Sequence, residues 1–210
     1  MEIGLAVILF LTLVVSYVIV QETRARLHWR VLVKGGDMTA ITSLTEDQVN
    51  YWRRSRVPRG TPVSLWRGVQ STEILEISPS DLRVSCSVEG QYATVAGKRK
   101  EVSSALAEAF KLTARLADML LYDVPDVRFD SVRIDVFNTF RDSSGIATQQ
   151  CILTTTASRD VAEDLDWEGL SPEEVVRAFG GEFRTGENGV ALPLPIEIPP
   201  PRLDTAAAGA

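Results

Sequence analysis

Residues 131–157 read SVRIDVFNTFRDSSGIATQQCILTTTA and consist of two segments of strand character with a turn between them. In 131–141 apolar and polar residues alternate with a period of two, which is typical of a β-strand with one buried face. The segment 147–157 is rich in Thr and Ile, residue types that favour strands. The residues between them, DSSG at 142–145, are typical of a turn. The sequence therefore predicts an antiparallel hairpin at this point.

A long amphipathic helix is predicted before the hairpin. In 98–124, KRKEVSSALAEAFKLTARLADMLLYDV, apolar residues recur at spacings of three and four, as along one face of a helix, and Pro125 follows. We expect the apolar side of this helix to pack on the rest of the domain. The polar residues opposite are expected to form an ordinary solvated face: Glu108, Lys111, Arg115 and Asp118.

Shorter elements are predicted on both sides of this helix and hairpin. Thr45 and Gln48 have the spacing of a capping box and predict a helix at 46–54. After the hairpin, Ser158 precedes a helical segment at 159–167, and Ser171 followed by Pro172 marks a second helix start. The remaining predicted strands would form a small antiparallel sheet and a terminal hairpin: 63–65, 73–77, 82–88, 91–96 and 182–194.

These elements predict one α+β domain at 61–198, with antiparallel strands packed against about four helices. A basic segment with a short helix is expected at 21–60. The tail at 199–210 has too few apolar residues to fold and is expected to be disordered.

The first twenty residues, MEIGLAVILFLTLVVSYVIV, are apolar almost throughout. From Ile3 to Val20 there is no charge, and at about 1.5 Å per residue this run is long enough to cross most of a bilayer core. A cleaved signal peptide would have a basic start and a small-residue cleavage site, and a buried globular helix would keep a polar face. The sequence therefore predicts a transmembrane anchor at 1–20.

Positive residues follow this apolar run, whereas no Lys or Arg precedes it. By the positive-inside rule, the prediction is a single-pass membrane protein with its N-terminus outside and its C-terminal domain in the cytoplasm. Seven residues are expected to lie at the membrane surface: Arg24, Arg26, Trp29, Arg30, Lys34, Arg53 and Arg54.

The formal net charge of −6 is unevenly distributed along the chain. Residues 21–60 hold eight Lys and Arg against four Asp and Glu, a net of +4, whereas 61–210 hold 14 against 23, a net of −9. The basic part suits an anionic lipid surface, and the acidic part argues against general nucleic-acid binding. The expected partners are therefore the lipid bilayer and other subunits of a membrane complex, although the acidic surface also serves solubility.

Cysteine and histidine are scarce in this chain. Cys86 and Cys151 lie far apart, belong to no CxxC motif and are interpreted as small apolar residues in a reduced compartment. His28 is the only histidine. We therefore expect neither a metal site nor a cofactor.

Residues 101–160 contain, in order, a predicted helix, a strand, a turn, a second strand and the start of another helix. The acidic residues near the first strand are Asp126, Asp130 and Asp135. Gln150 begins a Gln-Cys-Ile sequence in the second strand, which resembles the Gln-Cys-Lys strand of restriction-endonuclease-like, Mrr-type cores. The resemblance implies a Mg²⁺ site formed by acidic residues with a Lys beside it. Ile152 stands in place of that Lys, so the resemblance indicates a catalytically silent member.

Three functional hypotheses follow from these features. The first is a membrane-anchored, non-catalytic accessory or assembly protein whose cytoplasmic domain binds other proteins of a membrane complex. The second is a membrane-tethered, metal-dependent nuclease-like enzyme, or its inactive relative, with Asp126, Asp130, Asp135 and Gln150 at its site. The third is a domain that binds anionic lipid surfaces through its arginines. The first is favoured, because the domain has no His to activate a Ser or Cys nucleophile.

Overall fold

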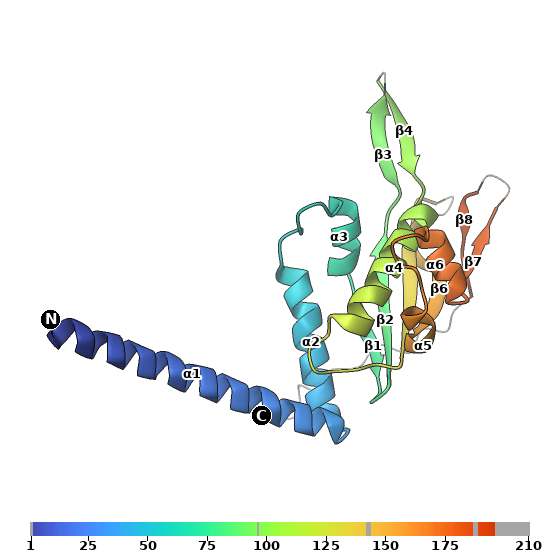
Figure 1. Ribbon diagram of the computed structural model, residues 1–210. Helices are drawn as coiled ribbons and strands as arrows, with labels where there is room; N and C mark the ends of the chain where they lie inside the picture. Colours follow the sequence, from blue (N-terminus) through green and yellow to red (C-terminus); the bar gives the residue numbers. More distant parts are fainter. Residues whose placement is uncertain (1, 96, 142–143, 187–188, 196–210) are drawn as a thin grey trace, which may run out of the picture.

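The computed structural model describes residues 2–95, 97–141, 144–186 and 189–195, and at 2–9, 25–28 and 95 it describes the backbone only. The described residues form six helices and eight strands (Figure 1). The helices are α1 (Glu2–Lys34), α2 (Met38–Arg54), α3 (Val63–Gln70), α4 (Ala105–Tyr122), α5 (Arg159–Glu163) and α6 (Pro172–Ala178). The strands are β1 (Glu73–Ile77), β2 (Asp81–Val88), β3 (Gln91–Val95), β4 (Lys98–Ser103), β5 (Ser131–Arg141), β6 (Ala147–Ser158), β7 (Glu182–Thr185) and β8 (Ala191–Leu192). The tail predicted at 199–210 lies outside the described residues.

Six of the strands form one mixed sheet in the order β1-β2-β5-β6-β7-β8. Strand β2 runs parallel to β5, with Asp81 opposite Ser131, whereas the other neighbours in this sheet are antiparallel. Strands β3 and β4 form a separate two-stranded ribbon that projects from the domain (Figure 1). The chain is α+β, but the predicted architecture of antiparallel strands with about four helices is wrong.

The parallel pair of strands is explained by the helix between them. Antiparallel neighbours need only a turn, whereas a parallel neighbour needs a long crossover that returns the chain to the same end of the sheet. Helix α4 lies in this crossover, between β2 and β5 in the chain, and packs on β2, β5 and β6 (Figure 1). Helix α4 returns the chain to the same end of the sheet, so that β5, the first strand of the predicted hairpin, pairs with β2 in parallel. The sheet is therefore mixed.

The hydrophobic core lies between α4 and the sheet. Leu112 and Leu116 of α4 and Ile134 and Val136 of β5 are completely buried in it. A Cβ atom at Gly68 of α3 would lie 2.6 Å from Cδ2 of Leu112, closer than van der Waals contact allows. The glycine therefore lets α3 approach α4 and cover the end of the core.

Helix α4 begins at Ala105, later than the predicted start at Lys98. The basic segment Lys98–Ser103 is strand β4, and Ser104 caps the helix by accepting a hydrogen bond from the N–H of Ala107 at 3.2 Å. The predicted strand at 63–65 is also wrong, since this segment opens helix α3. Short apolar runs do not distinguish a strand from a helix, and tertiary contacts decide both segments.

Helix α2 begins at Met38, before the predicted start at residue 46. Asp37 is its N-cap, because Oδ1 accepts from the N–H groups of Thr39 at 2.9 Å and Ala40 at 3.2 Å. Thr45, the predicted cap, is buried inside the helix, where its hydroxyl donates to the carbonyl of Ile41 at 2.8 Å. The predicted end at residue 54 is correct.

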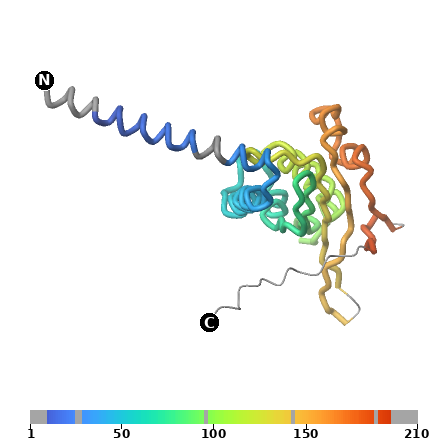
Figure 2. Tube along the Cα trace, turned by 90° about the horizontal axis from the view of Figure 1, so that it is seen from below, coloured from blue at the N-terminus to red at the C-terminus, as the bar shows by residue number. Residues whose placement is uncertain are grey.

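Helix α1 extends away from the domain as one rod of 33 residues (Figure 2). It ends in a Schellman motif, in which Gly36 has a φ of 75°. The N–H of Gly36 donates to the carbonyl of Val33 at 2.9 Å, and the N–H of Asp37 donates to that of Leu32 at 3.0 Å. This turn sends the chain directly from α1 into α2.

The predicted transmembrane anchor is wrong, because within the described residues no helix is both long enough and apolar enough to cross a bilayer. In the part of α1 whose side chains are described, eleven residues from Phe10 to Val20 form the apolar run, and Glu22 and Arg24 follow. The side chains of residues 3–9 lie outside the description. The prediction of a single-pass protein with a cytoplasmic domain depended on the anchor and fails with it.

Candidate functional site

Strand β5 carries a carboxylate on the face of the sheet that α4 does not cover. The residues on either side of Asp135 point into the core, so its own side chain points to the opposite, outer face. Asp135 is nevertheless fully buried. Three neighbouring side chains surround it, and together with Asp135 we call them the outer-face cluster: Arg83 of β2, Arg133 of β5 and Thr154 of β6.

Each carboxylate oxygen of Asp135 has two donors. Oδ2 accepts from Nε of Arg83 at 2.8 Å and also lies 2.8 Å from Nη2 of the same guanidinium. Oδ1 accepts from Oγ1 of Thr154 at 2.6 Å and from Nε of Arg133 at 3.3 Å. A carboxylate has about four acceptor positions, and the four donors occupy them. Asp135 therefore has no lone pair available for a metal ion or for a substrate proton.

Strand register brings the outer-face cluster together. Arg83 lies opposite Arg133 in the β2–β5 pair, and Thr154 lies opposite Asp135 in the β5–β6 pair. Two guanidinium groups side by side repel each other unless an acid lies between them. Asp135 supplies that acid, so the cluster joins three adjacent strands at the centre of the sheet.

The other residues of the predicted nuclease-like site lie in different surroundings. Asp126 follows α4 with a φ of 61°, and its Oδ1 accepts from Nε of Arg30 in α1 at 2.5 Å. Asp130 is exposed just before β5, and Gln150 is partly buried in β6. In the part of the chain that the structure describes, no three His, Cys, Asp or Glu side chains form a group that would hold a metal ion. The nuclease resemblance and its site stay predictions.

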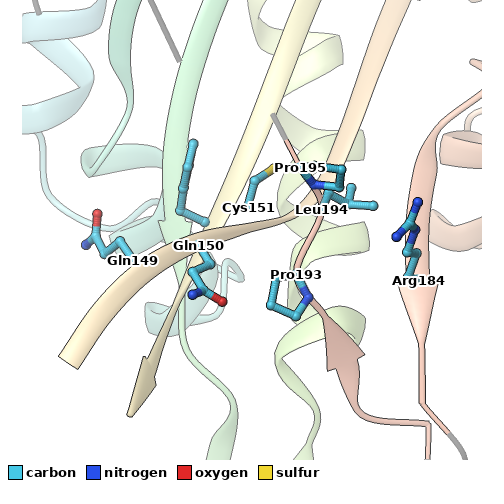
Figure 3. Close-up of a pocket in the computed structure, with 8 residues that line it drawn as sticks. Gln149, Gln150, Cys151, Arg184, Pro193, Leu194 and Pro195 are labelled. Atoms are coloured by element: carbon cyan, nitrogen blue, oxygen red, sulfur yellow. The ribbon is translucent and has the colours of Figure 1, made fainter. Parts of the chain in front are cut away.

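A pocket of about 540 Å³ lies beside β6 and β7. Figure 3 shows Gln150 of β6 and Arg184 of β7 on opposite sides of the segment 193–195, which also lines the pocket. The N–H of Leu194 donates to the carbonyl of Cys151 at 2.8 Å, so this segment follows the edge of β6. Burial raises the pKa of Cys151 to about 11. The thiol therefore stays protonated near neutral pH and is a poor nucleophile.

A second buried carboxylate belongs to α4. Glu108, which was expected on a solvated face, is only 4% exposed. Four side chains donate to its oxygens, namely Ser64 at 3.3 Å, Gln91 at 2.6 Å, Ser103 at 2.6 Å and Lys111 at 2.8 Å. Three of these donors come from outside α4. Helix periodicity gave no signal for this site, because the donors are brought in by α3, β3 and β4.

The surroundings of Glu108 act on its pKa in opposite directions. Burial alone would raise the pKa, but hydrogen bonds from Lys111, Ser103 and Gln91, together with the charge of Lys111, outweigh burial. The pKa of Glu108 is therefore lowered from its ordinary value of 4.5. Glu108 is charged at neutral pH and ties the base of the β3–β4 ribbon to α4.

The residues predicted at a membrane surface lie in several surroundings. Arg30 pairs with Asp126, and Arg53 donates to the carbonyl of Thr72 from Nε at 3.1 Å and from Nη2 at 2.6 Å. These two arginines therefore connect α1 and α2 to the domain. The side chain of Arg26 lies outside the description. The remaining four are exposed: Arg24, Trp29, Lys34 and Arg54.

No protein-family model matches the chain, and the comparisons with curated proteins and with solved structures give no match either. The function of the chain therefore has to be argued from its own residues and their geometry.

Proposed function

We propose that this chain is a non-catalytic accessory protein that joins a multi-subunit assembly through helix α1. The observation that carries the proposal is the exposure of apolar side chains around α1. From Phe10 to Val20, nine large apolar side chains are each between 43% and 66% exposed. A helix that faces water normally has a polar side, whereas only Thr12 and Ser16 interrupt this stretch.

Burial of this surface would supply free energy for binding. Burying one Val, Leu or Phe side chain stabilises a complex by about 1.5–3 kcal/mol relative to leaving it in water. A contiguous apolar surface on the outside of a protein marks an interaction site. The partner that fits is a group of apolar helices from another protein, because Phe10–Val20 is apolar in nearly every direction and must be enclosed.

The domain holds α1 at its C-terminal end. Arg30 of α1 pairs with Asp126 at 2.5 Å, and the Schellman turn at Gly36 leads into α2, which packs in the core through Val49 and Trp52. The apolar part of α1 extends away from these contacts (Figures 1 and 2). This arrangement presents α1 to a partner while the domain keeps its own core.

The polar groups of the domain also suit binding better than catalysis. The carboxylate of Asp135 is saturated by Arg83, Arg133 and Thr154, and that of Glu108 by four donors. Buried acids with complete sets of donors stabilise a fold but do not transfer protons readily. The domain is therefore proposed to act as a rigid body that α1 attaches to the assembly.

The proposal is tested by comparing Val18→Glu in α1 with Val63→Glu in α3. Both valines are 54% exposed, so the two variants introduce the same charge on surfaces of equal exposure. Each full-length variant is extracted from cells under mild conditions. Native electrophoresis and mass spectrometry then identify the proteins that co-purify with it. Partner proteins are expected to be lost from Val18→Glu and retained by Val63→Glu.

Partner proteins that stay with Val18→Glu, or that are lost equally from both variants, would overturn the proposal. A second measurement uses the purified full chain and phosphatidylcholine vesicles. If the chain floats with the vesicles and has no protein partner, lipid covers α1 and the proposal also fails.

A further inference from the structure

The β3–β4 ribbon is the second element that projects from the domain (Figure 1). Tyr92 is 52% exposed and Val102 is 66% exposed, although both are strand residues. At its base, Gln91 and Ser103 donate to Glu108, which fixes the direction of the ribbon. A two-stranded ribbon alone is at best marginally stable in water. A binding partner would therefore stabilise the outer half of this ribbon.

The outer end of the ribbon is basic. Lys98, Arg99 and Lys100 are consecutive and exposed, and we call them the basic tip. The guanidinium carbon of Arg99 lies 4.2 Å from the centre of the Tyr92 ring, so this side chain is held along the ribbon. Lys98 and Lys100 are two residues apart in a strand and share a face. The tip therefore presents two ammonium groups in the same direction.

An acidic surface lies at the opposite end of the domain, on α5 and the residues after it (Figure 1). We call it the α5 patch, and it consists of five exposed acids: Asp160, Glu163, Asp164, Asp166 and Glu168. The sequence has no Lys or Arg from 160 to 176. Arg128 pairs with Glu163 at 3.3 Å, but one arginine does not balance five acids.

We propose that the basic tip of one copy binds the α5 patch of a second copy of this chain. The two surfaces have opposite charge and lie at opposite ends of the domain, so each copy offers both of them to its neighbours. A contact of this kind is heterologous. Copies joined in this way form open chains or rings rather than a closed two-fold dimer.

Charge also favours the acidic patch of a second copy over nucleic acid as the ligand of the basic tip. The tip has three cations with Glu101 beside them, whereas salt-dependent duplex binding commonly involves about six or more phosphate contacts. The chain from 61 to 210 has a net charge of −9, which repels a polyanion. An acidic protein surface of limited size matches the tip better.

The test uses the full chain carrying Val18→Glu, so that α1 contributes little to association. Starting from this parent, the ribbon variant has Lys98→Glu and Lys100→Glu, which leave Arg99 on Tyr92. The patch variant has Asp160→Lys, Asp164→Lys and Glu168→Lys, which leave only Glu163 and Asp166 as acids among the five positions and so reverse the charge of the patch. Sedimentation velocity is measured over a range of concentrations at about 50 and about 300 mM salt.

The parent is expected to self-associate at low salt, with association about tenfold weaker at high salt, because exposed ion pairs are screened. Each variant alone is expected to stay monomeric, because one of its two surfaces has reversed charge. An equal mixture of the two variants is expected to associate as the parent does. In the mixture, the acidic tip of the ribbon variant can bind the basic patch of the patch variant. The unchanged tip of the patch variant can bind the unchanged patch of the ribbon variant.

Recovery in the mixture separates a specific contact from simple loss of folding, which mixing would not repair. A parent that shows no salt-sensitive association, or a mixture that stays monomeric, overturns the inference. The inference also fails if the parent is monomeric and binds duplex DNA while the ribbon variant, without Lys98 and Lys100, does not. The tip would then be a nucleic-acid-binding surface. None of these outcomes depends on the partners of α1, which are measured by co-purification.

Discussion

Two buried carboxylates among the described residues, Glu108 and Asp135, lie on opposite sides of the sheet and are neutralised in different ways. Glu108 accepts from three uncharged side chains and one lysine, whereas Asp135 lies between two arginines and one threonine. Glu108 joins separate elements at the edge of the core, and Asp135 joins adjacent strands.

This difference shows two ways in which a small domain neutralises a buried carboxylate. Removing one partner of a buried charge pair leaves the other charge uncompensated. Removing the charge of Glu108 leaves three uncharged donors and Lys111, which is partly exposed to water, and this costs less. The variants below separate these two cases.

Asp135→Ala is expected to have the largest effect, a loss of about 3–5 kcal/mol in the free energy of unfolding. The substitution leaves Arg83 and Arg133 next to each other with no acid between them. Urea denaturation measures the loss, and Asp135→Asn, which keeps the shape and one acceptor, is expected to lose less. A loss below about 1 kcal/mol for Asp135→Ala would contradict the importance of the cluster.

Glu108→Gln is expected to have an intermediate effect at neutral pH, a loss of about 1–3 kcal/mol. The amide group keeps one oxygen but presents an NH₂ group to donors such as Ser103 and Lys111. Urea denaturation again measures the loss. Glu173→Gln is the matched control, because Glu173 is exposed and pairs with Arg177 on the surface of α6.

The same variant makes a prediction about pH. Because the pKa of Glu108 is lowered in the folded chain, its stabilisation is complete above its ordinary pKa of 4.5 and is lost as the pH falls through the folded value. The stability difference between the natural chain and Glu108→Gln is therefore expected to shrink as the pH falls below 4.5 and through the lower folded pKa. A difference that does not shrink at any pH below 4.5 would show that the charge of Glu108 contributes nothing.

Thr154→Val is expected to have the smallest effect, a loss of about 0.5–1.5 kcal/mol. It removes one donor to Asp135 and leaves both arginines in place. Thr156→Val is the control, since Thr156 is exposed two residues further along the same strand. Equal unfolding midpoints for the two variants would mean that the 2.6 Å hydrogen bond of Thr154 has no net effect on stability.

The local features of the fold were predictable from the sequence. The hairpin predicted at 131–141 and 147–157 matches β5 (Ser131–Arg141) and β6 (Ala147–Ser158) closely. The cap at Ser171 is also confirmed, because its Oγ accepts from the N–H of Glu174 while the Glu174 carboxylate accepts from the N–H of Ser171. Both features depend on residues close together in the chain.

The features that the sequence did not predict depend on how strands pair with one another. The parallel pairing of β2 with β5 arises from register partners such as Asp81 and Ser131. The basic segment Lys98–Ser103 has helix-forming residues but pairs with Gln91–Val95 as a strand. Tertiary contacts of this kind outweigh local propensity.

The candidate site was predictable only in part. Asp135 was among the candidate acids, but its partner Arg83 is 52 residues away in the chain. Nothing in the spacing of the sequence connects the two. The burial of Glu108 was missed for the same reason, since Ser64 lies 44 residues from it.

The parallel pair at the centre of the sheet also bears on how the chain reaches its native state. A new chain completes strand β2 about fifty residues before the β5 residues that pair with it, as Asp81 and Ser131 illustrate. The β5–β6 hairpin is local and is expected to form within microseconds, whereas its docking on β2 has to close a long loop. Until that step, one edge of β2 has no neighbour and is open to pairing with other chains. Refolding at high concentration is therefore expected to favour aggregation through the open edge of β2.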